Sequence, residues 1–213
     1  MRVLAYELGF ASYTTITVYI NTQNCNANCE ARYSFKSFEF NNRNTSIVTQ
    51  QNITTMSPNK PAKVVFGTGS VGDTLTGDDL KNTLELFRKH GHVELDTAAT
   101  YPINNFGASE KALAQQDLSW ASLSTKISAM KERANSLENF RDSLATSEKQ
   151  LSGKEIDILY FHMPDAVTPL EEQAAAMDEA YRAGKFKRFG ISNFAPQQIE
   201  ELMEIVERKG ECH

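Results

Sequence analysis

The 213-residue sequence has few cysteines, with only three, and it has one tryptophan and six prolines. Cys25 and Cys29 have no second ligand pair beside them, so neither a disulfide framework nor a zinc site is indicated, and free thiols favour a reducing, cytoplasmic compartment. No apolar run reaches the roughly 18 residues that a membrane-spanning helix needs. The formal net charge of -5 argues against a surface that binds nucleic acid or anionic membranes.

Residues 1–55 differ in composition from the rest of the chain. They are rich in Asn, Thr and Ser, and they show neither the period of two typical of strands nor the period of about 3.6 typical of helices. We therefore expect this leader to be disordered or loosely packed. Met56 starts a second region, 56–213, in which the sequence predicts the folded domain.

From residue 63 onward, short apolar runs alternate with amphipathic segments. Strands are predicted at 63–67, 93–96, 120–126, 156–162 and 186–191. A helix is predicted after each strand, and the one after the fourth strand has a capping-box pattern at 168–171 (TPLE), with proline in the first helical position. Successive β/α units predict an α/β fold with a parallel sheet, because parallel strands need crossover connections.

An open doubly wound sheet and a closed barrel both fit this alternation. Two motifs favour an open-sheet dehydrogenase: the glycine pattern 67–72 (GTGSVG) and the spacing of Tyr181 and Lys185. The helix after the glycines is predicted to start only near Asp78, so a phosphate would not lie on its N-terminus. Gly184 ends the other helix before Lys185, so the tyrosine and lysine would not share a helix face. Both motifs lack the context that their function requires.

Chemically active side chains stand at the ends of three consecutive predicted strands. Asp96 ends the second strand, Lys126 the third and His162 the fourth, while Tyr101 follows in the loop after Asp96. Neighbouring parallel strands lie about 4.8 Å apart and end at one edge of the sheet. A carboxylate, an ammonium, an imidazole and a phenol are therefore expected in one site. Each residue alone has an ordinary structural explanation, and it is their joint placement that favours a site.

These residues lie within longer motifs that resemble the aldo-keto reductase family. The motifs are 95–101 (LDTAATY), 125–126 (TK), 161–165 (FHMPD) and 190–194 (GISNF). The third motif and the residues after it are most similar to the aflatoxin-aldehyde reductase branch. The resemblance implies a (β/α)8 TIM barrel, here partial with about five β/α units, and a site on the C-terminal face of its strands. It also implies reduction of aldehydes and ketones to alcohols with NADPH.

The resemblance assigns a role to each of the four strand-end residues. Tyr101 matches the family's proton donor, and Lys126 and Asp96 match its supporting pair. His162 matches the group that orients the substrate carbonyl, so Tyr101 and His162 are also expected to contact the substrate. Physical reasoning agrees, because a nearby ammonium is expected to lower the pKa of a phenol, and a buried ammonium needs a carboxylate partner.

Contacts to the cofactor are implied for three residues. Ser192 and Asn193 match the contacts to the nicotinamide carboxamide of NADPH, and Asp96 also borders the cofactor. No residue cluster supports a metal site. The expected partner is a small-molecule carbonyl compound, with no nucleic acid and no membrane.

The sequence also departs from the family pattern. A barrel of this kind has roughly 250 residues, and the resemblance does not cover the last three β/α units, where family members hold the adenine and the 2′-phosphate. Weak NADPH binding is therefore expected. The first and fifth strands are predicted to be unpaired edges of the sheet. Such edges expose backbone hydrogen-bonding groups and apolar surface, so low stability or a homo-oligomer is expected. The alternative function is a catalytically inactive scaffold or regulatory protein built on the reductase fold.

Overall fold

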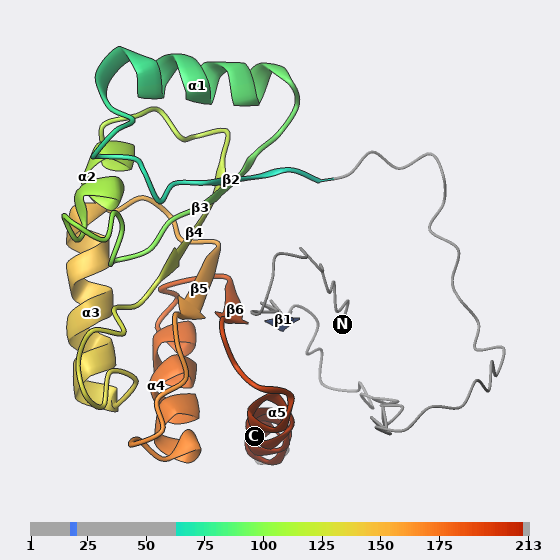
Figure 1. Ribbon diagram of the computed structural model, residues 1–213. Coiled ribbons are helices and arrows are strands. Elements are labelled where there is room, and N and C mark those ends of the chain that lie inside the picture. The colour runs from blue at the N-terminus through green and yellow to red at the C-terminus, as the bar shows by residue number, and fades with distance from the viewer. Residues whose placement is uncertain (1–17, 21–62, 211–213) are drawn as a thin grey trace, which may run out of the picture. The chain divides into compact units, whose positions relative to one another are not determined.

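The computed structural model describes residues 18–20 and 63–210 of the chain (Figure 1). Its centre is a six-stranded sheet with the strand order β1-β6-β5-β4-β3-β2. The strands are β1 (Val18–Ile20), β2 (Val65–Gly67), β3 (Glu94–Asp96), β4 (Ser122–Lys126), β5 (Ile158–Phe161) and β6 (Arg188–Ile191). Strands β2 to β6 are parallel, and β1 pairs antiparallel with β6. The predicted parallel α/β sheet is confirmed.

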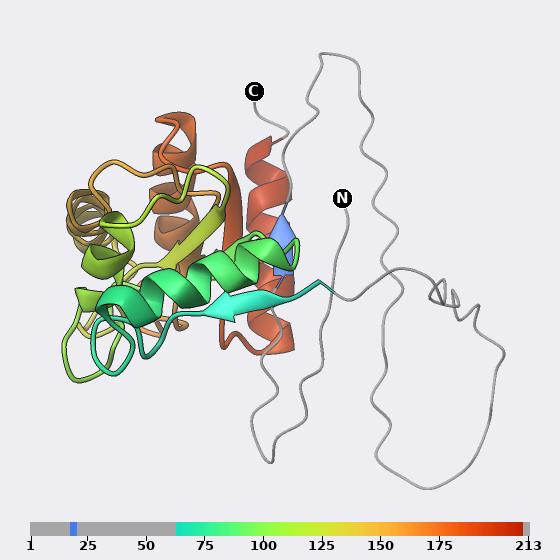
Figure 2. The same cartoon turned by 90° about the horizontal axis from the view of Figure 1, so that it is seen from above.

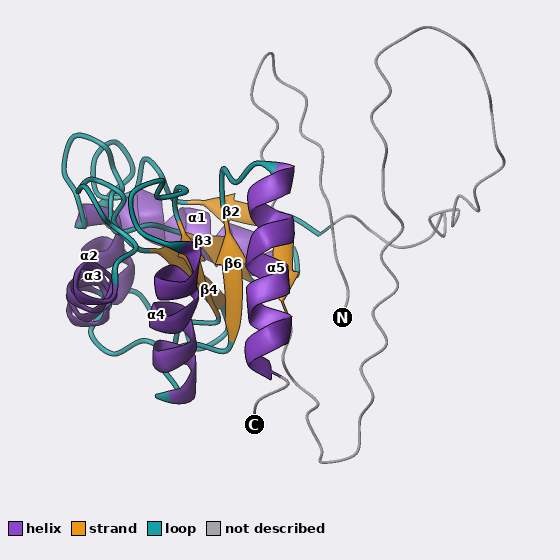
Figure 3. Cartoon of the chain, turned by 90° about the horizontal axis from the view of Figure 1, so that it is seen from below, coloured by secondary structure: helices purple, strands orange, loops and turns teal. Residues whose placement is uncertain are grey.

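One helix follows each parallel strand. The helices are α1 (Gly77–Lys89), α2 (Ala108–Ala114), α3 (Leu137–Gln150), α4 (Leu170–Arg182) and α5 (Pro196–Gly210). They form an arc on one side of the strands, from α1 through α2 and α3 to α4 and α5 (Figures 1 and 3). The view from above shows the same arc, with β2 and α1 at one end of the sheet (Figure 2).

The two faces of the sheet differ in chemistry, because successive side chains of a strand point to opposite faces. The side chains that pack against the helices form the core, and among them are Leu95, Leu123, Leu159, Phe161 and Ile191. The side chains on the other face line a cavity, and among them are Glu94, Asp96, Ser124, Lys126, Tyr160 and Arg188. A doubly wound sheet has helices on both faces, so this arrangement is that of a barrel wall.

The glycine pattern at 67–72 forms a turn and does not open a helix. The helix after it begins at Gly77, with Thr76 as its N-cap residue. Gly72 has a φ of +84°, and a Cβ at this position would lie 2.7 Å from the backbone carbonyl carbon of Ala108. Glycine is required here because the turn packs directly against the start of α2. The pattern therefore has a structural explanation, as its distance from the helix start predicted.

The start of α4 differs from the predicted capping box. Pro169 is the N-cap residue of the helix, and the Thr168 side chain makes no capping hydrogen bond. Its Oγ1 donates instead to Oδ2 of Asp165 at 2.7 Å. Oδ1 of Asp165 accepts from the backbone N–H of Val167 and of Thr168. Asp165 organises the loop before the helix and uses the hydroxyl that the capping box would need.

The edges of the sheet differ from the prediction at one end. The fifth predicted strand, β6, is not an unpaired edge, because Val18 and Ile20 of β1 lie opposite Ile191 and Phe189. The other end matches the prediction: β2 is the terminal strand of the described sheet, and Val65 is 46% exposed there. The rest of the leader lies outside the described residues, so its expected disorder stays a prediction. No helix in the described ranges is long and apolar enough to cross a bilayer.

Candidate active site

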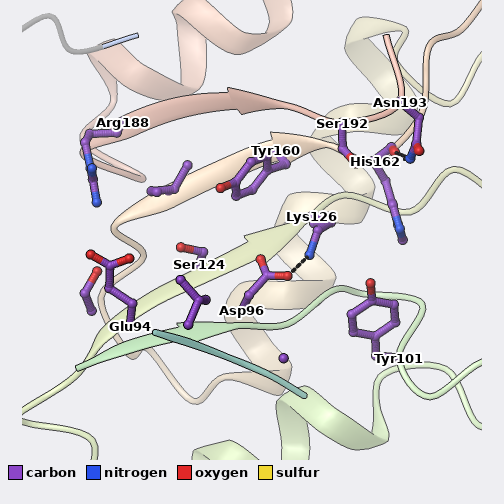
Figure 4. A pocket seen from close by; sticks show the side chains of 14 residues that line it. Glu94, Asp96, Tyr101, Ser124, Lys126, Tyr160, His162, Arg188, Ser192 and Asn193 are labelled. Carbon is purple, nitrogen blue, oxygen red and sulfur yellow. Dashed lines mark hydrogen bonds and ion pairs between the residues drawn. The ribbon is translucent and has the colours of Figure 1, made fainter. Parts of the chain in front are cut away.

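The predicted site residues lie around one cavity of about 490 Å³ on the face of the sheet that the helices leave open. The lining includes Asp96, Tyr101, Lys126, His162, Ser192 and Asn193. Figure 4 shows these side chains converging on the cavity from the strand ends and from the loops that follow them. The structure therefore brings together all six residues that the sequence singled out.

The parallel register explains this convergence. Asp96 is the last residue of β3 and Lys126 the last of β4, while His162 and Ser192 follow directly after β5 and β6. Since all these strands run in one direction, their carboxyl ends meet at the same edge. Tyr101 reaches the same edge from the loop after β3, where its backbone N–H bonds to the carbonyl of Ala98 at 3.0 Å.

A buried ion pair lies at the centre of the site. Lys126 Nζ is 2.6 Å from Oδ2 of Asp96 and donates at 2.9 Å to the carbonyl of Thr97. The Lys126 side chain is only 8% exposed and that of Asp96 29%. Burial lowers the pKa of the Lys126 ammonium, and the negative Asp96 opposes this change. The carboxylate is needed because a buried ammonium without a partner is strongly disfavoured.

Tyr101 packs beside this ion pair. The Lys126 ammonium lies 5.1 Å from the centroid of the Tyr101 ring, and the ring meets that of His162 edge-on, with centroids 5.7 Å apart. Burial raises the pKa of the Tyr101 phenol, and the negative Asp96 raises it further. The expected net lowering of this pKa is wrong for this structure, because burial and the Asp96 carboxylate together outweigh the effect of the nearby ammonium. Tyr101 is therefore a protonated phenol at neutral pH.

His162 is held as a neutral imidazole. Burial, and then the positive Lys126, lower the pKa of its ring from the usual 6.5 to about 4. Its Nδ1 lies 3.2 Å from Oγ1 of Thr100, a residue that the sequence reasoning missed. When Thr100 donates this hydrogen bond, the ring proton stands on Nε2, the nitrogen that remains for a ligand in the cavity.

The ring of His162 is expected to titrate with a midpoint near 4 in the folded chain and near 6.5 in the unfolded chain. Between these values the unfolded state binds more protons than the folded state, so stability falls as the pH drops from about 6.5 toward 4. Two-dimensional NMR of the histidine side chains across this range, with His162→Gln to assign the resonance, measures the midpoint. A folded-state midpoint near 6.5 would contradict the buried, cation-facing position of the ring.

Two buried amides fix the chain directly after His162. Asn135 and Gln173 are fully enclosed, at 1% and 0% exposure. The Asn135 amide donates to the carbonyl of Met163 at 3.1 Å and to Oε1 of Gln173 at 2.8 Å. The Gln173 amide donates to the carbonyl of Asp165 at 2.8 Å. Sequence reasoning missed this pair, although a glutamine on the apolar face of α4, next to a buried alanine, was an available signal.

Ser192 and Asn193 form one corner of the cavity. Asn193 has a left-handed backbone with φ +64°, a conformation in which asparagine is enriched among residues other than glycine. Its Nδ2 donates to the carbonyl of His162 at 2.9 Å and to Oγ of Ser192 at 3.0 Å. The side-chain oxygen Oδ1 of Asn193 and the hydroxyl proton of Ser192 remain for a ligand. A primary amide requires such a pair of one acceptor and one donor.

Known proteins resemble most of the described part of the chain. Residues 63–213 match the sequence model of the aldo/keto reductase family. The chain belongs to the aldo/keto reductase family. It is 37% identical over 135 residues to an aldo-keto reductase of Pseudocercospora fijiensis, covering 60% of this chain and 44% of the relative. It is 31% identical over 160 residues to the mouse aflatoxin B1 aldehyde reductase member 2, covering 72% of this chain and 42% of the relative.

Solved structures of aldo/keto reductases share the fold. The structure of a thermostable aldo-keto reductase in complex with the inhibitor epalrestat matches with a TM-score of 0.56 and 24% identity, covering 66% of this chain and 53% of that one. The glycerol dehydrogenase of Gluconobacter oxydans matches with a TM-score of 0.55 and 26% identity, covering 66% and 47%. The partial TIM-barrel fold is thereby confirmed. The chain spans about half the length of the curated relatives that it matches.

Proposed function

We propose that this aldo/keto reductase reduces aldehydes or ketones to alcohols, with NADPH as the hydride donor. The observation that carries the proposal is the placement of a protonated phenol and a neutral imidazole, Tyr101 and His162, beside the buried Lys126–Asp96 pair. The cavity of about 490 Å³ lies within the range of roughly 300–1,000 Å³ that is usual for small-molecule sites. A small carbonyl compound is the proposed substrate.

The chain's own groups supply the acid half of the reaction. Addition of hydride to a carbonyl carbon places negative charge on the carbonyl oxygen, and the Tyr101 hydroxyl gives that oxygen its proton. The nearby Lys126 ammonium stabilises the phenolate that forms, and Asp96 keeps this ammonium charged. The Nε2–H of His162 donates a hydrogen bond to the same oxygen as its charge develops. Proton exchange with water then restores the phenol.

The residues at the nicotinamide end of the proposed site fit the cofactor. Ser192 and Asn193 would hold the carboxamide, since one offers a hydroxyl proton and the other an amide oxygen. Bound NADPH supplies the hydride. A cytoplasmic location also belongs to this proposal, supported by the low number of cysteines in the sequence. So does association of copies through the edge at β2, supported by Val64 and Val65, each 46% exposed.

The proposal is tested by following NADPH oxidation at 340 nm with 4-nitrobenzaldehyde and the full 213-residue chain. We expect turnover that depends on the aldehyde and is lost in Tyr101→Phe. A chain that unfolds cooperatively but shows no turnover at high NADPH concentration would contradict the proposal. That result would instead support the inactive scaffold or regulatory protein.

A further inference from the structure

The Lys126 ammonium has a second aromatic neighbour besides Tyr101. Its Nζ lies 5.5 Å from the centroid of the Tyr160 ring and 5.1 Å from that of Tyr101. Both distances are within the roughly 6 Å over which a cation is attracted to an aromatic face. Tyr160 is 4% exposed and lies on β5, two residues before His162. The period of two along this strand places both side chains on the cavity face.

The strand register explains why the Tyr160 ring lies beside the ammonium. Lys126 on β4 is directly opposite Tyr160 on β5, and Tyr160 is directly opposite Gly190 on β6. A Cβ at Gly190 would lie 2.4 Å from two carbons of the Tyr160 ring, closer than packed atoms come. The ring therefore occupies the space that a side chain on β6 would fill, and Figure 4 shows it on the cavity side of the two strands.

We propose that Tyr160, whose ring packs against Gly190, is a positioning residue that holds the Lys126 ammonium between its own ring and that of Tyr101. Asp96 and the Thr97 carbonyl take two of the three ammonium N–H groups. The two rings limit the movement of the remaining N–H group, so that it stays near Tyr101 when the phenol gives up its proton. This positioning role rests on the proposed function. The packing of the Tyr160 ring against the Lys126 ammonium does not depend on that function.

The charged and titratable groups that face the ammonium come from three segments. Asp96 on β3 favours the charged form of Lys126, His162 after β5 is neutral, and Tyr101 in the loop after β3 is protonated. Against this background the Tyr160 ring adds an attraction that leucine cannot supply and phenylalanine can. Tyr160→Leu keeps an apolar side chain in the space above Gly190, so water entry stays limited. Tyr160→Phe is the matched control because only the hydroxyl is removed.

The test is a pH titration of the full chain by NMR, with carbon-13 at Cε of lysine and Lys126→Arg to assign the resonance. We expect the Lys126 midpoint in Tyr160→Leu to lie about one pH unit below that in Tyr160→Phe. Equal midpoints in these two variants would overturn the proposal. Since the titration needs neither cofactor nor turnover, its result is separate from the success or failure of the proposed reductase activity.

Gly190→Ala provides a second variant that keeps both tyrosines. The added methyl group forces the Tyr160 ring away from its position against Gly190. The titration midpoint of Lys126 is therefore expected to fall as in Tyr160→Leu. An unchanged midpoint in folded Gly190→Ala would count against the proposal even if Tyr160→Leu does not fold. With turnover established in the parent chain, kcat should fall about tenfold in Tyr160→Leu with KM unchanged. It should fall less than twofold in Tyr160→Phe.

Discussion

Replacing Tyr101 with phenylalanine is expected to lower kcat for aldehyde reduction by about 10²- to 10⁴-fold, the usual contribution of a positioned proton donor. The phenyl ring can still pack edge-on against His162 and lie beside Lys126, as the tyrosine ring does. The substitution therefore removes the donated proton and leaves the cavity wall in place. KM for the aldehyde should change little, because the lost interaction acts mainly in the transition state.

Steady-state rates over a range of aldehyde concentrations measure this effect, and Tyr181→Phe is the matched control. Tyr181 lies on α4 and packs against Phe186, with ring centroids 5.8 Å apart. Since Tyr181 does not line the cavity, its substitution should leave kcat within about twofold. If Tyr101→Phe keeps more than a tenth of the parent kcat, Tyr101 is not the proton donor.

Replacing Phe161 with alanine is expected to lower the free energy of unfolding by about 3–5 kcal/mol, the cost typical of removing a buried phenylalanine. The side chain is 0% exposed and sits between the sheet and the helices. Its ring centroid lies 5.4 Å from that of Phe189, 6.0 Å from that of Phe140 and 6.3 Å from that of Phe194. Aromatic rings enclose it on three sides, so the space left by the removed side chain would close only in part.

Equilibrium unfolding in urea, monitored by circular dichroism, measures this loss. Because domains are stable by only about 5–15 kcal/mol, this loss is a large share of the total, and the urea midpoint of Phe161→Ala is expected to fall clearly. Leu86→Ala is the matched control: Leu86 is 57% exposed, and its loss should change stability by no more than about 0.5 kcal/mol. A loss below 1 kcal/mol in Phe161→Ala would show that Phe161 does not anchor the core.

Local periodicity was sufficient to predict the β/α order and the strand ends. The apolar stripe of α3, with Phe140 and Leu144, and the continuous apolar run of β5 are properties of neighbouring residues, so they are visible in the sequence. Asp96, Lys126 and His162 could be predicted to meet because parallel strands end at one edge. These expectations required only the chain order and the parallel direction of neighbouring strands.

Contacts between distant segments could not be predicted in the same way. The capping box at the start of α4 failed because Asp165 competes for the Thr168 hydroxyl, and only the folded loop brings their side chains together. The pairing of β1 with β6 joins residues far apart in the chain, and no local pattern marks it. The raised pKa of Tyr101 depends on burial and on the nearby Asp96 carboxylate, and both are set by the tertiary structure.

The sequence by itself determined the α/β class, the parallel strands and the residue types at the strand ends, because each follows from spacing along the chain. Only the tertiary structure decided that the helices cover one face of the sheet, which leaves the other face for the cavity. It also decided that Tyr160 lies on Gly190 beside Lys126, because the register of three strands sets which side chains meet. Distances across strands depend on the whole fold, and spacing along the chain does not contain them.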